Sequence, residues 1–129
     1  MDPERTPVIV GVGQTVNRPK SMEEIREPAD LIEESARKAA RDGGAEGALG
    51  DVELLGVVNI LSWSYAYAPD TVAERIGARP AVRWYTGVGA CGPQWMLAEA
   101  ADKIARGEVK VALICGAESY ASRSTARKC

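Results

Sequence analysis

Gly87-Val88-Gly89-Ala90-Cys91-Gly92-Pro93 is the stretch around which the chain is organised. It follows a short run of β-forming residues, 81–86, and leads into the most strongly helical run, 93–106. Three glycines and a proline between a strand and a helix predict a sharp turn that presents backbone N–H groups and one side chain. The functional question is whether Cys91 is a nucleophile or the glycines bind a phosphate.

Hydrophobic patterning on either side of this turn predicts an alternation of strands and helices. Continuous apolar runs bounded by glycines are typical of strands that are buried on both faces. Apolar residues three and four apart, closed by glycine, are typical of helices. We predict strands at 7–13, 52–61, 81–86 and 109–115, and helices at 28–41, 70–76 and 93–106. In the last helix, Leu97, Ala101 and Ile104 form the predicted buried stripe, broadened by Met96 and Ala100.

The resulting order, β-α-β-α-β-α-β, predicts an α/β fold with a mostly parallel sheet. Each connection is long enough for a crossover between parallel strands. Ligands of such sheets bind beyond the carboxyl ends of the strands. The turn at 87–93 lies at such an end, so its position suits a functional site.

Bulk properties describe an ordinary globular protein. The chain has 129 residues, 46% of them hydrophobic, and a formal net charge of -2. This charge gives no reason to expect nucleic acid or an anionic membrane as a partner. No apolar run approaches the roughly 20 residues that span a bilayer, and residues 1–5 lack the apolar core of a signal peptide. These features favour a cytoplasmic location.

Cysteine and histidine usage narrows the possible chemistry. The three cysteines, Cys91, Cys115 and Cys129, have no CxxC spacing, so we expect neither a disulfide framework nor a metal site. Cys115 lies within an apolar strand and is predicted to be part of the core. The chain contains no histidine, so a Cys–His pair cannot be completed within it.

Two interpretations of the turn remain open on the residues alone. As a nucleophile, Cys91 at a helix N-terminus would be favoured as thiolate, and the amides near Gly89 and Gly92 would stabilise an oxyanion. As a phosphate site, Gly87-x-Gly89-x-x-Gly92 matches a dinucleotide fingerprint, with Glu118 ending the next strand. That fingerprint normally follows the first strand of its domain, whereas this one follows the third.

The chain as a whole resembles the N-terminal part of the thiolase superfamily, nearest to acetyl-CoA acetyltransferase-like and thiolase-like proteins. The resemblance rests on Pro7-Val8-Ile9-Val10-Gly11-Val12-Gly13-Gln14-Thr15, on Ala29-Asp30-Leu31-Ile32-Glu33, and on the strand at Val57-Val58. Its most specific part is Gly107-Glu108-Val109-Lys110-Val111-Ala112-Leu113-Ile114-Cys115-Gly116-Ala117-Glu118.

The resemblance implies acyl transfer between coenzyme A thioesters through an acyl-cysteine at Cys91, with no covalently bound cofactor. It also implies a homodimer formed across residues 81–86. Counting back from Gly107 without a gap places Ala90 in the nucleophile position, and a one-residue deletion restores Cys91. A thiolase-fold protein that binds without catalysing is therefore the alternative function.

The resemblance further implies that residues 1–129 form an incomplete N-terminal thiolase-like domain. The histidine and second cysteine of active thiolases come from regions beyond the matching part, so we expect this chain alone to be inactive. We also expect the isolated chain to be marginally stable or to aggregate.

Overall fold

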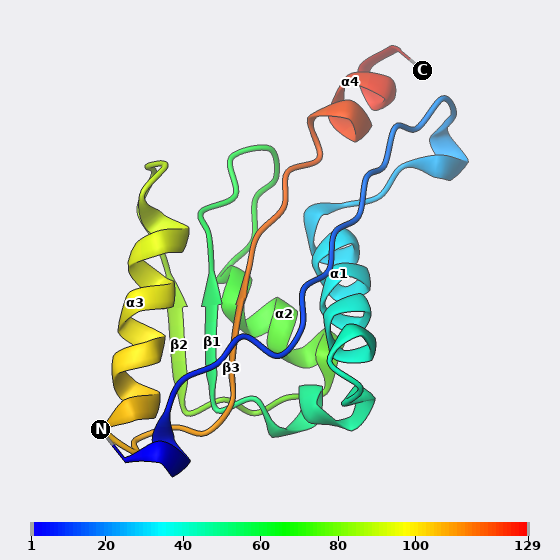
Figure 1. Ribbon diagram of the computed structural model, residues 1–129. Coiled ribbons are helices and arrows are strands. Elements are labelled where there is room, and N and C mark those ends of the chain that lie inside the picture. Colours follow the sequence, from blue (N-terminus) through cyan, green and yellow to red (C-terminus); the bar gives the residue numbers. More distant parts are fainter. Residues whose placement is uncertain (1, 129) are drawn as a thin grey trace.

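The computed structural model describes residues 2–128 as an α/β layer structure (Figure 1). Within this part of the chain, one sheet contains β1 (Leu54–Val57), β2 (Val82–Tyr85) and β3 (Ala112–Cys115) in the order β2-β1-β3. The helices are α1 (Pro28–Asp42), α2 (Ala68–Ile76), α3 (Gly92–Ala105) and α4 (Tyr120–Lys128), with 3-10 turns at Pro3–Arg5, Met22–Glu24 and Glu46–Asp51.

Both strand pairings are parallel, as predicted. Leu54 in the central strand is level with Val82 on one side and with Ala112 on the other. The predicted strands 52–61, 81–86 and 109–115 each contain an observed strand of four residues. The α/β fold class with a parallel sheet is therefore confirmed.

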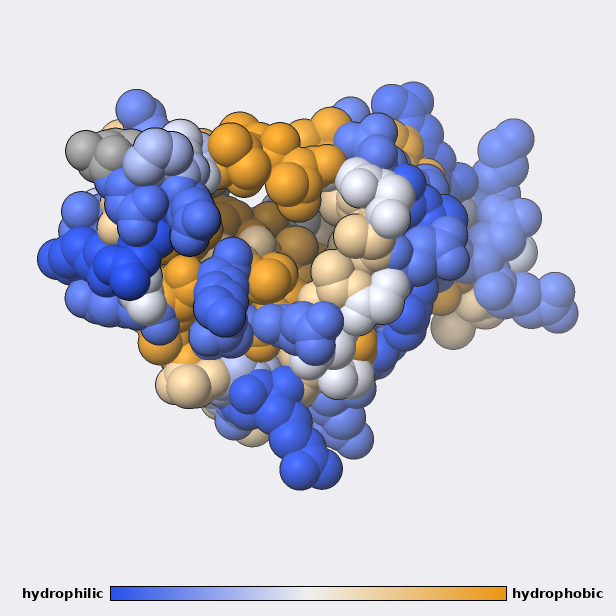
Figure 2. All heavy atoms as spheres, turned by 60° about the horizontal axis from the view of Figure 1, so that its bottom comes forward, coloured by the Kyte–Doolittle hydropathy of each residue, from blue (hydrophilic) through white to orange (hydrophobic). Residues whose placement is uncertain are grey.

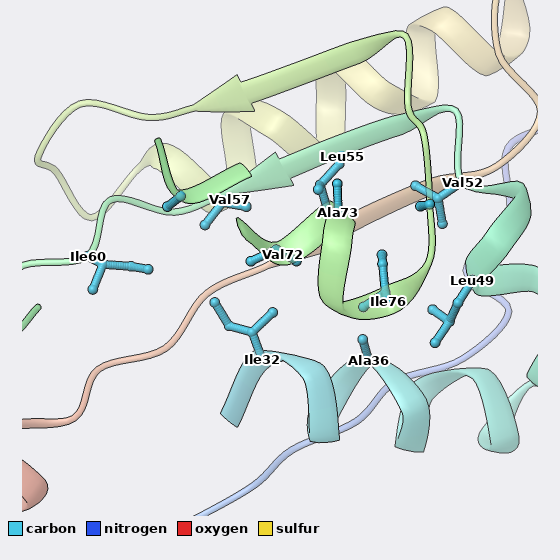
Figure 3. Packing of buried hydrophobic residues seen from close by; sticks show 12 residues of the cluster. Ile32, Ala36, Leu49, Val52, Leu55, Val57, Ile60, Val72, Ala73 and Ile76 are labelled. Carbon is cyan, nitrogen blue, oxygen red and sulfur yellow. The ribbon is translucent and has the colours of Figure 1, made fainter. Parts of the chain in front are cut away.

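The larger core lies between the sheet and the pair of helices α1 and α2 (Figure 3). Because side chains alternate along a strand, Leu55 and Val57 of β1 point to this face. They meet Ile32 of α1 and Val72 of α2, and all four side chains are essentially inaccessible to solvent. The other buried members of this cluster are Ala36, Leu49, Val52, Ile60, Ala68, Ala73, Ile76 and Ala78.

Among residues 2–128, α3 is the helix that covers the opposite face of the sheet (Figure 1). Leu54 packs there with Ala100 and Val109. Gly56 permits the close approach of α3, because a Cβ at this position would stand 2.6 Å from the sulfur of Met96. The predicted stripe through Leu97 is wrong: Met96 and Ala100 are buried, whereas Leu97 is 47% exposed.

The predicted strand at residues 7–13 is also wrong. This segment, which we call the strap, is extended but pairs with no strand, and the side chains of Val8, Ile9, Val10 and Val12 are about 70% exposed. The strap instead packs on α1, because Gly11 and Gly13 let it lie flat against that helix. A Cβ on Gly11 would stand 2.1 Å from the carbonyl oxygen of Ala39, so the strap contacts α1 through its backbone and turns its side chains outward.

Two smaller predictions are corrected at helix ends. The helix expected at 70–76 begins two residues earlier, at Ala68, with Tyr67 at the N-cap position. Asp70 lies in its first turn and forms an ion pair with Arg83 of β2, at 2.5 Å. The polar segment after residue 119, for which no element was predicted, forms α4. Cys129 lies outside the described residues.

Candidate functional site

The turn between β2 and α3 places Cys91 at a helix N-terminus, as predicted. Cys91 is the N-cap residue of α3, and its carbonyl oxygen accepts a hydrogen bond from the N–H of Trp95 at 3.0 Å. Its side chain makes no capping hydrogen bond, and the residue is exposed. The thiol is therefore accessible at the positive end of a 14-residue helix.

The glycines of the turn differ in what they do. A Cβ on Gly92 would stand 3.1 Å from the hydroxyl of Thr86, so glycine at this position lets the helix start close to the end of β2. The N–H of Gly92 donates to the carbonyl of Gly89 at 3.4 Å. Nothing lies within 4 Å of a Cβ on Gly87 or Gly89. A role for Gly89 and Gly92 in oxyanion binding stays a prediction.

One further amide of the first helical turn was not identified from the sequence. Pro93 has no N–H, and the N–H of Gln94 has no hydrogen-bond acceptor among residues 2–128. Such unpaired amides at a helix start can bind an anion or a developing negative charge. The sequence signal for this amide was Pro93. Because proline has no N–H, the next backbone donor after Gly92 is the N–H of Gln94.

A cleft of about 450 Å³ lies beside this turn, at the carboxyl ends of β1 and β3. Its position agrees with the expectation for parallel sheets. Pro93 contributes the α3 side of the cleft, two residues from Cys91, but Cys91 itself does not line it. The remaining lining residues come from the ends of the two strands: Val58, Asn59, Ile114, Cys115, Gly116, Ala117 and Glu118.

The wall formed after β1 is fixed from the β2 side by Asn59. The backbone N–H of Asn59 donates to the hydroxyl of Thr86 at 2.9 Å, and its side-chain amide donates to the carbonyl of Thr86 at 3.1 Å. The next residue, Ile60, donates its N–H to the hydroxyl of Tyr85 at 2.9 Å. These bonds join the cleft wall directly to the segment that carries Cys91.

The same wall is fixed from the β3 side by Glu118. Its two carboxylate oxygens accept hydrogen bonds from the N–H groups of Leu61 and Ser62, at 2.7 and 2.8 Å. The hydroxyl of Ser62 accepts in turn from the N–H of Ser119 at 2.8 Å. Since both oxygens are engaged, the Glu118 carboxylate is not free for a ribose hydroxyl, which weakens the dinucleotide interpretation of the turn.

Cys115 is a structural residue in this arrangement. Its side chain packs against the core under α1 and α2, and its thiol donates to the carbonyl of Gly56 at 3.5 Å. Burial raises the pKa of the Cys115 thiol to about 12. The thiol therefore stays protonated near neutral pH and is a poor nucleophile there, which agrees with its predicted place in the core.

Residues 2–128 contain neither a metal-binding cluster nor a membrane-spanning helix. No group of three acidic, cysteine or histidine side chains could hold a metal ion there. Over the same residues, none of the helices reaches the length and apolarity needed to cross a bilayer.

Many solved structures resemble this chain, among them three of different proteins. A monomeric SCP2-thiolase like protein type 1 from Mycobacterium smegmatis is 34% identical to this chain, with a TM-score of 0.78. The match covers 92% of this chain and 24% of the Mycobacterium smegmatis protein. The 3-oxoacyl-[acyl-carrier-protein] synthase III of Aquifex aeolicus VF5 is 17% identical, with a TM-score of 0.68. That match covers 86% of this chain and 44% of the synthase. OleA of Xanthomonas campestris, with bound lauric acid and lauroyl-CoA, is 20% identical, with a TM-score of 0.64. That match covers 78% of this chain and 32% of OleA.

The chain thus spans about a quarter to a half of the length of these neighbours. No protein-family model matches it, and neither does any curated protein.

Proposed function

Because this chain has the thiolase fold, as its resemblance to the thiolase superfamily predicted, we propose that it is part of a thiolase-like acyltransferase of the acetyl-CoA acetyltransferase type. Its substrate is a coenzyme A thioester. The observation that carries the proposal is the exposed thiol of Cys91 at the start of α3, beside a cleft at the carboxyl ends of β1 and β3.

In the proposed reaction, the thiolate of Cys91 attacks the thioester carbonyl. The new C–S bond forms as the bond to the coenzyme A sulfur breaks, and the departing thiolate takes up a proton. The helix dipole stabilises the attacking thiolate. The amides of the turn near Gly89 and Gly92, with the free N–H of Gln94, are the proposed donors to the charge that develops on the carbonyl oxygen, and the Gly92 amide would exchange its bond to the Gly89 carbonyl for this one.

The chain has no histidine, so an imidazole that deprotonates Cys91 or protonates the leaving thiol would come from another part of the protein. In keeping with this, we propose that residues 1–129 are an incomplete N-terminal thiolase-like domain. Their coverage of only 24% of the Mycobacterium smegmatis protein supports this proposal.

A homodimer across residues 81–86 is the proposed assembly. β2 stands at the edge of the sheet, and its four residues are only half-buried. An edge strand of this kind can pair with a second copy. The neighbour from Mycobacterium smegmatis is monomeric, so the mass in solution, by light scattering, decides between the two states.

A non-catalytic thiolase-fold binding protein is the second candidate. It is favoured by two observations: Cys91 does not line the cleft, and the N–H of Gly92 already has an acceptor within the turn. In that case the cleft binds a ligand while Cys91 stays unmodified.

Labelling with a radioactive acetyl-CoA separates the two candidates. In the full-length protein we expect label on Cys91, located by peptide mapping, and loss of the label in Cys91→Ala. Cys115→Ala is the matched control, because that thiol is buried and protonated, and it should keep the label. An unlabelled wild-type protein that still binds acetyl-CoA would favour the binding protein, and label that persists in Cys91→Ala would exclude Cys91.

A further inference from the structure

The two ends of the sheet are built from different kinds of residue. At the amino ends of the strands, which Figure 2 turns towards the reader, hydrophobic side chains form the rim and much of the wall of a hollow. At the carboxyl ends, the cleft wall is joined to the turn that carries Cys91 by hydrogen bonds centred on Thr86. Thr86 directly follows β2, and its side chain takes no part in the proposed reaction.

The side chain of Thr86 packs directly under the start of α3. A Cβ on Gly92, the first residue of this helix, would stand 3.1 Å from the Thr86 hydroxyl oxygen and 3.2 Å from its methyl carbon. Ordinary contacts begin at 3.4 Å, so the backbone of Gly92 lies against this side chain more closely than any other residue type would allow. Because Cys91 is joined to Gly92, the position of Cys91 depends on this contact.

Thr86 is in turn held by the central strand and the loop that follows it. The backbone N–H of Asn59 donates to the Thr86 hydroxyl, and the side-chain amide of Asn59 donates to the Thr86 carbonyl. The N–H of Thr86 donates to the carbonyl of Val57 in β1, at 3.2 Å. All four residues of β1 are buried, whereas those of β2 and β3 are half-buried. Thr86 therefore has a fixed place relative to the best-protected strand of the sheet.

The hydroxyl oxygen connects these two sets of contacts. It accepts the hydrogen bond from Asn59 and also stands against Gly92. Serine at position 86 would keep this oxygen. Valine would keep the branched shape but replace the oxygen with a methyl group, which accepts no hydrogen bond and needs more room against Gly92.

We propose that Thr86, held by Asn59, is a positioning residue that sets where Cys91 and the amides of the first turn of α3 stand. The inference rests on the proposed function in taking Cys91 as the reacting group. Thr86 acts through Gly92 and does not touch the substrate. A displaced helix start weakens the support that the helix dipole gives to the thiolate and misaligns the thiolate with the thioester carbonyl.

Two reactions of Cys91 in the full-length protein test the proposal: alkylation by iodoacetamide at neutral pH and acylation by acetyl-CoA, each located by peptide mapping. Thr86→Val should slow alkylation by about 2- to 5-fold, the size of a helix-dipole effect. It should slow acylation by about 10-fold or more, because that reaction also needs aligned atoms. Thr86→Ser should keep both rates near those of the wild type. Alkylation of Thr86→Val at the wild-type rate would overturn the proposal.

Tyr85→Phe separates positioning from a general loss of stability. The Tyr85 hydroxyl accepts from the N–H of Ile60 at 2.9 Å, so this variant breaks a bond of the same length between the same loop and the end of β2. It leaves the helix start alone, because the three atoms nearest to a Cβ on Gly92 all belong to Thr86. Tyr85→Phe should lower Tm as Thr86→Val does, with both rates unchanged. Equal slowing of alkylation in the two variants would mean that Thr86 acts through stability alone, against the proposal.

The same contact can be disturbed from the helix side, which keeps the proposal falsifiable if Thr86→Val does not fold. Gly92→Ala pushes a methyl group against the Thr86 side chain and should slow alkylation of Cys91 as Thr86→Val does. Gly87→Ala is the matched control in the same turn, because nothing lies within 4 Å of that Cβ, and it should leave alkylation unchanged. Wild-type alkylation in Gly92→Ala would refute the positioning role.

Alkylation also separates this inference from the proposed function. A wild-type protein that is alkylated at Cys91 but not acylated by acetyl-CoA would refute the acyltransferase, and the alkylation rates of the Thr86 and Gly92 variants would still decide the positioning role. Acylation of the wild type together with unchanged rates in those variants would keep the acyltransferase and refute the role of Thr86.

Discussion

The two faces of the sheet differ in how completely the helices cover them. Towards α1 and α2, Leu55 and Val57 are sealed within a cluster of buried side chains. Towards α3, Leu54 is sealed, but Trp95 and Leu97 are about half exposed although α3 is apolar on several sides. The difference shows that the apolar character of a helix indicates how much surface it can bury, and the neighbouring elements decide how much it does bury.

The largest expected effect is on the sealed face. Leu55→Ala removes a side chain with no solvent exposure from the centre of the cluster. We expect the free energy of unfolding, measured by urea denaturation, to fall by about 2–5 kcal/mol. A loss below about 1 kcal/mol would mean that this core is loosely packed.

The next effect tests the close contact under α3. Gly56→Ala places a methyl group 2.6 Å from the sulfur of Met96 and 3.0 Å from Cδ1 of Ile114, and should cost about 1–3 kcal/mol. In the double variant with Met96→Ala, the loss should be smaller than the sum of the two single losses, because the clash is removed. Simple additivity in urea denaturation would contradict a contact between Gly56 and Met96.

A smaller effect, dependent on pH, belongs to the α1 and α2 face. The hydroxyl of Tyr65 accepts the N–H of Ala29 at the start of α1, at 3.0 Å. Burial raises the pKa of Tyr65 to about 12, above the ordinary value near 10. The folded state therefore binds the proton of the Tyr65 hydroxyl more tightly than the unfolded state does. The protonated hydroxyl contributes fully to stability below pH 10, and this contribution is lost as the pH rises towards 12.

Tyr65→Phe should therefore flatten the alkaline fall in stability between pH 10 and 12, as measured by urea denaturation across that window. Tyr120→Phe, which alters an exposed residue of α4, is the matched control and should keep the wild-type slope. An identical slope in all three proteins would mean that Tyr65 does not contribute.

The smallest effect is expected on the open face. Leu97→Ala changes a side chain that is 47% exposed, so the free energy of unfolding should change by about 1 kcal/mol or less. A loss as large as that of Leu55→Ala would show that Leu97 is covered in solution, for example by another subunit.

Sequence patterns predicted the elements that bury their side chains locally. The runs at 52–61, 81–86 and 109–115 contain the three strands, and Cys91 is at the start of α3. The strap has the same apolar pattern as β1, yet it remains outside the sheet, because pairing depends on a distant partner that the pattern does not specify. The predicted burial of Leu97 was wrong for a similar reason. Several faces of α3 are apolar, and the close contact with Gly56 places Met96 rather than Leu97 against the sheet.

The candidate site was predicted only in part. The position of the cleft followed from parallel strands, but its walls come from residues without a motif, such as Asn59 and Ala117. Glu118 was considered as the acidic residue of a dinucleotide fingerprint, whereas its carboxylate accepts hydrogen bonds from the amides of Leu61 and Ser62. Hydrogen bonds between loops 57 residues apart in sequence leave no local signal that could be read along the chain.

The short loop after β1 couples the two halves of the site mechanically. β2 and β3 do not touch, since β1 separates them. The loop is nevertheless bonded to Thr86 on the β2 side through Asn59, and to Glu118 on the β3 side through Leu61. Through these hydrogen bonds the loop connects the β3 side of the cleft with the segment that leads to Cys91.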